Sequence, residues 1–248
     1  MSLNNIVIVG ASSAIAEAVA RRLVHPGARF VLAGRRRLAL EHTAADLILR
    51  GALSAEVVDV DVGDLASLDG AVNHARSLLE GHIDLALVAH GTLTDQARAD
   101  RDAGYAMAEF GVNATSTIEL LRLLAAAMVE KGSGRLAVIS SVAGDRGRGS
   151  NALYGSAKAA VTAFASGLGQ RFRASGLLVT VVKPGFVDTP MTARITKNAL
   201  WASPDAVAAR IVKALRSGRP VVYAPAFWWV IMAIIKLIPE AIYRRLPL

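Results

Sequence analysis

The chain of 248 residues is long enough to bury a sizeable core. Its composition, with 53% hydrophobic and 19% charged residues, excludes a disordered or fibrous protein. It has no cysteine, which excludes disulfide scaffolds, cysteine–zinc sites and thiol nucleophiles, and its five histidines lack metal-ligand spacing, so no metal site is expected. The formal net charge is +8, and residues 191–248 carry most of it.

Short apolar runs alternate with longer segments of helical apolar spacing along the chain. Six runs rich in Val, Ile and Leu predict buried strands at 5–10, 29–34, 55–60, 84–90, 134–140 and 177–183. The segments between them predict helices at 14–25, 37–50, 65–80, 102–130 and 154–175. This alternation predicts an α/β fold, a single doubly wound parallel (Rossmann-like) sheet in residues 1–225. Residues 226–248 form a C-terminal apolar and basic helical tail, not a separate domain.

The first predicted strand ends in a small-residue loop that opens the next helix. Such a junction presents backbone N–H groups and the positive end of the helix dipole to a pyrophosphate. It predicts a dinucleotide site formed by Gly10, Ser12, Ser13 and Ile15. Tight helix–strand packing without a ligand is the alternative interpretation.

The second predicted strand is followed by three consecutive arginines. An NAD site usually has an acidic residue here for the ribose 2′-hydroxyl, whereas guanidinium groups suit a 2′-phosphate. Arg35 and Arg36 therefore favour NADPH over NADH. A solvated basic helix start is the alternative interpretation of these arginines.

A second cluster of polar residues predicts proton-transfer chemistry. Tyr154 and Lys158 lie one helical turn apart on one face, and Ser141 closes a predicted strand thirteen residues upstream of the tyrosine. A free tyrosine has a pKa near 10, and a nearby ammonium together with the cofactor's positive nicotinamide is expected to lower the pKa of Tyr154 toward neutrality. A serine hydroxyl beside it can bind a carbonyl oxygen.

These motifs, in this order and spacing, resemble the short-chain dehydrogenase/reductase family over residues 4–190. The resemblance implies that Tyr154 is the general acid in carbonyl reduction and the base in the reverse reaction. It further implies that Lys158 tunes Tyr154 and binds the nicotinamide ribose, that Ser141 orients the substrate oxygen, and that Asn113 holds a water that relays the proton.

The resemblance also implies further cofactor-binding residues. These are Asp61, Val62, Gly91, Pro184, Gly185, Val187 and Thr189. The chain departs from the family pattern where alanines replace two loop glycines, at Ala14 and Ala16, which puts close approach to the pyrophosphate in doubt. The family's Asn-Asn-Ala-Gly segment reads Val-Ala-His90-Gly here, and His90 is interpreted as a packed strand-end residue rather than a catalyst.

The C-terminal tail combines apolar, aromatic and basic residues. An uncharged run at 221–235 contains Trp228 and Trp229, and Lys236, Arg244 and Arg245 follow it. The run is too short to span a bilayer, but this pattern suits a helix at the headgroup level, in the plane of the membrane. A dimer-interface or lid helix is the alternative. The reactive residues are expected to lie outside this tail.

Together these features predict an NADPH-dependent reductase that converts a ketone into a secondary alcohol. The tail resembles that of decaprenylphosphoryl-2-keto-ribose reductases, which implies a lipid-linked substrate, a polyprenyl-phosphate keto-pentose, at the membrane surface. No signal peptide is evident, so we expect a cytoplasmic homo-oligomer, peripheral at the inner face of the plasma membrane. A general reductase of acyl, steroid-like or xenobiotic ketones is the alternative. A non-catalytic dinucleotide sensor would not need the reactive residues, and the aromatic interleaving of nucleic-acid binders is missing.

Overall fold

A computed structural model describes residues 3–246 of the chain and contains one sheet of seven parallel strands, in the order β3-β2-β1-β4-β5-β6-β7. The strands are β1 (Asn5–Val9), β2 (Arg29–Gly34), β3 (Ser54–Asp59), β4 (Leu85–Val88), β5 (Gly134–Ile139), β6 (Leu177–Pro184) and β7 (Val221–Ala224). The predicted doubly wound α/β fold is confirmed. The strand order reverses between β1 and β4, and open parallel sheets bind ligands at such a switch point.

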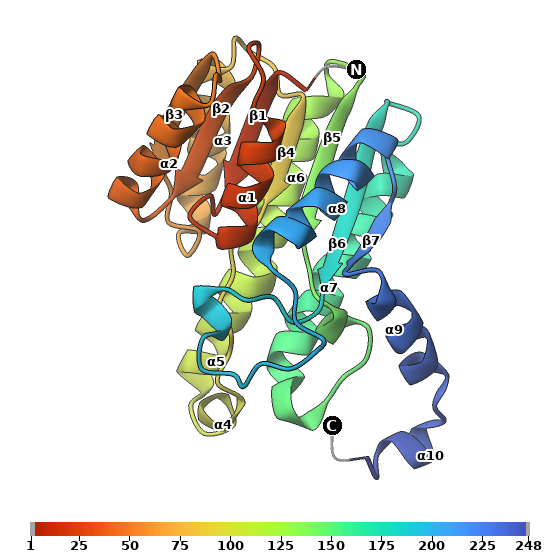
Figure 1. The fold of residues 1–248 in the computed structure, drawn as a ribbon. Helices are drawn as coiled ribbons and strands as arrows, with labels where there is room; N and C mark the ends of the chain where they lie inside the picture. The colour runs from red at the N-terminus through yellow and green to blue at the C-terminus, as the bar shows by residue number, and fades with distance from the viewer. Residues whose placement is uncertain (1–2, 247–248) are drawn as a thin grey trace.

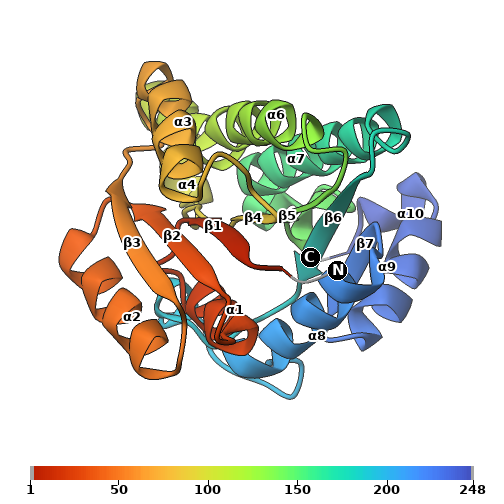
Figure 2. The ribbon, with the colours of Figure 1, turned by 90° about the horizontal axis from the view of Figure 1, so that it is seen from above.

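Helices cover both faces of the sheet, which explains why the strands are apolar on both sides. In β1, Ile6 and Ile8 join the core on one face, and Val7 and Val9 join the core on the other. Figure 2 shows α1, α2 and α8 on one face and α3, α6 and α7 on the other. Their bounds are α1 (Ala14–Leu23), α2 (Arg37–Leu49), α3 (Leu68–Leu78), α6 (Ser116–Val129), α7 (Ala152–Arg171) and α8 (Pro204–Ser217).

The structure contains elements that the sequence pattern does not predict: the strand β7, the helix α8 and the short helix α4 (Gln96–Ala99). The strand β7 extends the sheet beyond β6, with Val222 opposite Val182, and only Val222 and Ala224 of its four residues are fully buried. So short a strand gives too little periodicity to detect. The uncharged run at 221–235 is therefore part sheet and part helix, and the interpretation of the whole run as a surface segment is wrong.

The predicted helix at 102–130 is interrupted in the structure. It consists of α5 (Ala103–Phe110) and α6, joined by the π-helical turn η2 (Gly111–Thr115). The continuous helical segment 103–129 is long and apolar enough to cross a membrane, but 56% of its most apolar part is buried within the protein. Its α6 portion contacts α3, α7, β4 and β5, so we interpret it as a core helix.

The tail forms α9 (Phe227–Leu237) and α10 (Glu240–Tyr243) at the edge of the molecule (Figure 1). The guanidinium of Arg146, in the loop after β5, donates to the carbonyl oxygens of Ile235 at 2.5 Å and Ile238 at 2.6 Å. The same guanidinium lies 3.7 Å from the ring centroid of Tyr243. The tail is thereby fixed to the loop that connects β5 to α7. Residues 1–2 of the predicted domain and residues 247–248 of the predicted tail lie outside the described residues.

Candidate active site

A cavity of about 480 Å³ lies at the carboxyl ends of the strands and brings the predicted site residues together. Every predicted site residue except Asp61 lines it: Gly10, Ser12, Ser13, Ile15, Arg35, Arg36, Val62, Gly91, Asn113, Ser141, Tyr154, Lys158, Pro184, Gly185, Val187 and Thr189. Asp61 is exposed, and its carboxylate accepts a hydrogen bond from the backbone N–H of Gly63 at 3.0 Å. At that turn the cavity wall is Val62, which is buried.

The loop after β1 fits an anion at the amino terminus of α1. Gly10 has a φ of +76°, and a Cβ there would lie 2.4 Å from the backbone nitrogen of His90, so the position requires glycine. Ser13 precedes the helix and makes no side-chain capping bond, which leaves the first-turn N–H groups without a side-chain partner. Ala14 lines the cavity in regular helical conformation, so alanine at this position introduces no backbone strain.

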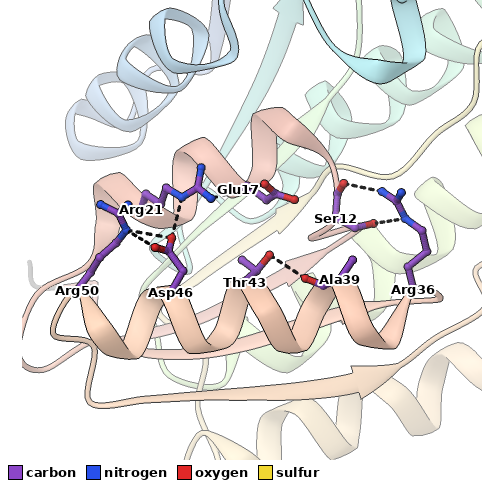
Figure 3. A network of polar contacts seen from close by, with 8 residues as sticks. All are labelled: Ser12, Glu17, Arg21, Arg36, Ala39, Thr43, Asp46 and Arg50. Atoms are coloured by element: carbon purple, nitrogen blue, oxygen red, sulfur yellow. Dashed lines mark hydrogen bonds and ion pairs between the residues drawn. The ribbon is translucent and has the colours of Figure 1, made fainter.

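The three arginines after β2 differ in their surroundings. Arg37 is paired with Glu41 and Asp59 and points away from the cavity lining. Arg36 donates to the backbone oxygen of Ser12 at 2.8 Å and to its Oγ at 3.3 Å (Figure 3). Arg35 lines the cavity and makes no ion pair or hydrogen bond within residues 3–246. Two cationic side chains therefore face this end of the cavity.

His90 is a packed residue, as predicted, and it also leaves one polar atom unsatisfied. Its Nε2 lies 3.0 Å from Ser116 Oγ and 3.1 Å from Thr117 Oγ1. Burial, reinforced by Lys158, lowers the pKa of His90 to about 3, so the ring is neutral. With Nε2 donating to Ser116 Oγ, which itself donates to the oxygen of Val112, Nδ1 would carry the lone pair. This Nδ1 is buried without a partner among the described residues.

These residues fit a dinucleotide. The Gly10 loop and the α1 amino terminus would hold the pyrophosphate, and His90 Nδ1 would accept a hydrogen bond from a hydroxyl of the cofactor. A nicotinamide dinucleotide bound there supplies or accepts a hydride.

The two serines after β5 have different roles. Ser140 is buried, and its Oγ donates to the backbone oxygen of Lys158 at 3.0 Å and contacts Thr162 Oγ1 at 2.8 Å, which fixes α7 against the sheet. Ser141 faces the cavity, where its Oγ accepts a hydrogen bond from the Ala143 N–H at 3.1 Å and also interacts with the Tyr154 hydroxyl. Of the two, Ser141 is thus the one beside the reactive phenol.

Burial keeps the reactive phenol protonated. It raises the pKa of Tyr154 to about 12, and the hydrogen bond with Ser141 offsets only part of that rise. Burial also lowers the pKa of Lys158 to about 8. Lys158 Nζ lies 5.6 Å from the Tyr154 ring centroid and donates to the oxygen of Ile139 at 3.3 Å. Desolvation dominates the pKa of Tyr154 in the protein alone, and the hydrogen bond with Ser141 opposes it. A lowering of that pKa by Lys158 together with a bound nicotinamide stays a prediction.

Asn113 lies in the π-helical turn, and its side chain is fully buried. Its amide group donates to Thr92 Oγ1 at 2.8 Å and to the backbone oxygen of Glu109 at 3.1 Å, while its Oδ1 accepts from the Thr92 N–H at 3.1 Å. Both donors are therefore used within the protein. The implied relay water would have to bind the remaining lone pair of Oδ1 or a backbone carbonyl.

The tail contributes to the cavity wall. Trp228 of α9 is 5% exposed and lines the cavity beside Gly185, where a Cβ would lie 1.8 Å from the indole nitrogen. Phe186 packs against Trp228 at 5.7 Å between ring centroids and stacks on Trp201 at 5.5 Å. The reactive residues themselves lie outside the tail, as expected, while Trp228 of the tail forms part of the wall of their cavity.

The cavity contains residues that the sequence analysis does not identify. Thr92 carries no sequence signal, and the pattern around Trp228 indicates a membrane-surface helix instead, because the place of each residue in the cavity depends on tertiary contacts. Arg148 also lines the cavity, and its only signal is its position in the segment that connects Ser141 to Tyr154.

A dinucleotide cavity that also contains a protonated, buried phenol defines an oxidoreductase. The short chain dehydrogenase family model matches residues 4–200, so the chain belongs to the short-chain dehydrogenase family. It therefore acts on CH–OH and C=O groups with a nicotinamide dinucleotide cofactor.

Two relatives support this assignment, and one solved structure shares the fold. The chain is 39% identical over 242 residues to the uncharacterized oxidoreductase Rv2073c of Mycobacterium tuberculosis, covering 98% of this chain and 96% of the relative. It is 37% identical over 243 residues to an uncharacterized oxidoreductase of Streptomyces coelicolor, covering 98% and 95%. The actinorhodin polyketide ketoreductase, solved with NADPH, shares the fold with a TM-score of 0.80 at 22% identity, covering 92% and 98%.

The lowered pKa of Lys158 predicts how activity depends on pH. As pH rises through about 8, Lys158 loses its charge, whereas Tyr154 keeps its proton up to about pH 12. We expect kcat/KM for reduction of a neutral ketone to fall above about pH 8, since this parameter reports free-enzyme pKa values. In Lys158→Arg the guanidinium stays charged, so the fall should disappear. A wild-type profile that is flat to about pH 10 would contradict the assignment.

Proposed function

We propose that the enzyme reduces a ketone to a secondary alcohol with NADPH as the hydride donor. The observation that carries the proposal is the half-buried Tyr154, whose desolvated hydroxyl stays protonated, in the cavity that Arg35 also lines. Ser141 would hold the carbonyl oxygen, and Tyr154 would donate its hydroxyl proton to that oxygen as negative charge develops there. Lys158 would bind the cofactor ribose and return a proton to the phenol through Asn113 and a water.

The arginines after β2 support NADPH as the cofactor. Among the described residues Arg35 has no ion-pair or hydrogen-bond partner and Arg36 contacts only the Ser12 loop, so both guanidinium groups are available to a 2′-phosphate. No Asp or Glu among the described residues lines the cavity to accept a bond from a ribose 2′-hydroxyl. This end of the cavity therefore offers guanidinium donors for a 2′-phosphate but no carboxylate acceptor, among the described residues, for a 2′-hydroxyl.

Replacing Arg35 and Arg36 by alanine should weaken NADPH binding by about 2–4 kcal/mol, because charge-assisted hydrogen bonds are lost. NADH binding should hardly change. Arg37→Ala is the matched control, since its guanidinium is already paired with carboxylates and should leave both affinities unchanged. Fluorescence titration with each cofactor measures the effect, and equal losses for NADPH and NADH would contradict the proposal.

We further propose that the ketone is lipid-linked and is reduced at the membrane surface. The observation behind this is that α9 is apolar on both sides. Trp228 and Met232 are buried, while an outer stripe of apolar residues is exposed: Phe227, Val230, Ile234 and Leu237. A lipophilic substrate could pass from a bilayer along α9 to the cavity, because the same helix forms the cavity wall.

The charges beside this stripe favour an anionic bilayer over a second copy of the chain. Lys236 and Arg245 are exposed and make no ion pair within residues 3–246, whereas Glu240 is already paired with Arg146 and Arg244. In a symmetric dimer through this face, the unpaired cations of both copies would repel one another. A polyprenyl-phosphate keto-pentose is the preferred substrate, and the membrane is the cytoplasmic face of the plasma membrane.

The outer stripe of α9 can be tested with vesicles. Ile234 and Leu237 are 60% and 81% exposed, so replacing both by glutamate should preserve the fold but abolish co-sedimentation with phosphatidylglycerol vesicles at low salt. The matched control replaces Leu38 and Leu49 of α2, which are 75% and 88% exposed, by glutamate and should retain vesicle binding.

Two outcomes would contradict the membrane proposal. Wild-type protein that remains in the supernatant with anionic vesicles at low salt would overturn it. A fall in sedimentation mass in the α9 variant alone would assign the stripe to a dimer interface instead.

A further inference from the structure

The cavity has a cationic residue at the end opposite the cofactor arginines. Arg148 lies in the loop between β5 and α7, whereas Arg35 and Arg36 follow β2. The strands β2 and β5 are three positions apart in the sheet, which corresponds to about 14 Å. Arg148 therefore reaches the cavity from a different strand end than Arg35 and Arg36 do. It is not among the residues assigned above to the pyrophosphate or the 2′-phosphate, so its role in the cavity is not accounted for by them.

Arg148 has no partner within residues 3–246. Its guanidinium makes no ion pair or hydrogen bond there, although the side chain is half-buried in the cavity wall. The nearest acid in sequence, Asp145, is buried and is already occupied by Lys183 and by the hydroxyl of Tyr223. Arg146, two residues before Arg148, is satisfied by the tail. A half-buried cation without a counter-ion is costly unless a ligand supplies the anion.

Two further polar atoms of the cavity-lining residues are buried without a partner among the described residues. They are the acceptor Asn151 Oδ1, three residues after Arg148, and the donor Trp228 Nε1. Asn151 precedes α7 but makes no side-chain capping bond. Apolar side chains complete the lining: Val142, Phe186, Met191 and Ile195. This end therefore offers a cation, hydrogen-bonding atoms and an apolar surface together.

We propose that Arg148 binds a phosphate group on the carbonyl substrate, so that the enzyme selects phosphorylated ketones. The inference deepens the proposed reductase function and rests on it, since it concerns the substrate end of the same cavity. A guanidinium suits this role because it binds two phosphate oxygens at once in a planar, bidentate geometry. Asn151 and Trp228 would pair with hydroxyl groups beside the phosphate.

Calorimetry on protein saturated with NADP⁺ tests the site, with geranyl phosphate, geraniol and methyl phosphate as probes. We expect wild-type protein to bind geranyl phosphate at least about tenfold more tightly than geraniol. Arg148→Gln should weaken geranyl phosphate by about 10- to 100-fold and leave geraniol unchanged. Arg173→Gln is the matched control, because Arg173 is exposed, lies outside the cavity lining and should retain wild-type affinities.

The outcomes separate this site from the function on which it rests. Equal affinity of wild-type protein for geranyl phosphate and geraniol, or an Arg148→Gln variant with wild-type affinity for the phosphate, overturns the anion site. Reduction of a neutral ketone by wild-type enzyme tests the reductase function independently of this result. If the affinity for geranyl phosphate falls in Arg148→Gln, tighter binding of geranyl phosphate than of methyl phosphate to wild-type protein identifies a lipid-linked phosphate. Equal binding of those two identifies a soluble phosphate ester.

Discussion

Lys158 is buried and Tyr154 half-buried on the face of α7 next to the end of β5, and desolvation acts on them in opposite directions. It lowers the pKa of the ammonium and raises that of the phenol, so both groups are shifted toward their neutral forms. The phenol therefore keeps the proton that carbonyl reduction requires. The position of the pair depends on Ser140, which bonds the carbonyl of Lys158 and fixes α7 to the sheet.

The sequence predicts those parts of the site that follow from local spacing. Tyr154 and Lys158 are four residues apart in a helix, and the strand–Gly10–helix junction is a local pattern, so both are recognisable without tertiary structure. The predicted strands also agree closely with β1 to β6, because each is a continuous apolar run. The sequence also contains capping residues for α8, because Ser203 caps its amino terminus and Gly218 ends it in a left-handed conformation. These residues lie outside the apolar runs from which the strands and helices are predicted.

The remaining features depend on contacts between distant segments. The π-helical turn that contains Asn113 interrupts an otherwise helical pattern, and Gly111 is its only local sign. Desolvation of Tyr154 depends on the whole cavity wall, so the spacing of Tyr154 and Lys158 could not predict the direction of its pKa shift. Trp228 reaches the cavity only because Gly185 leaves space for its indole ring. Arg146 then connects the loop after β5 to the carboxyl end of α9, so α9 is held by hydrogen bonds to the loop that follows Ser141.

The proposed reduction depends on proton donation by Tyr154, and the rate of a single turnover in Tyr154→Phe measures that donation. Phenylalanine retains the ring and its packing but removes the hydroxyl. NADPH oxidation by a neutral ketone should slow by about 10²- to 10⁴-fold, while NADPH affinity stays unchanged. A Tyr154→Phe enzyme that retains more than about a tenth of the wild-type single-turnover rate would show that another group donates the proton.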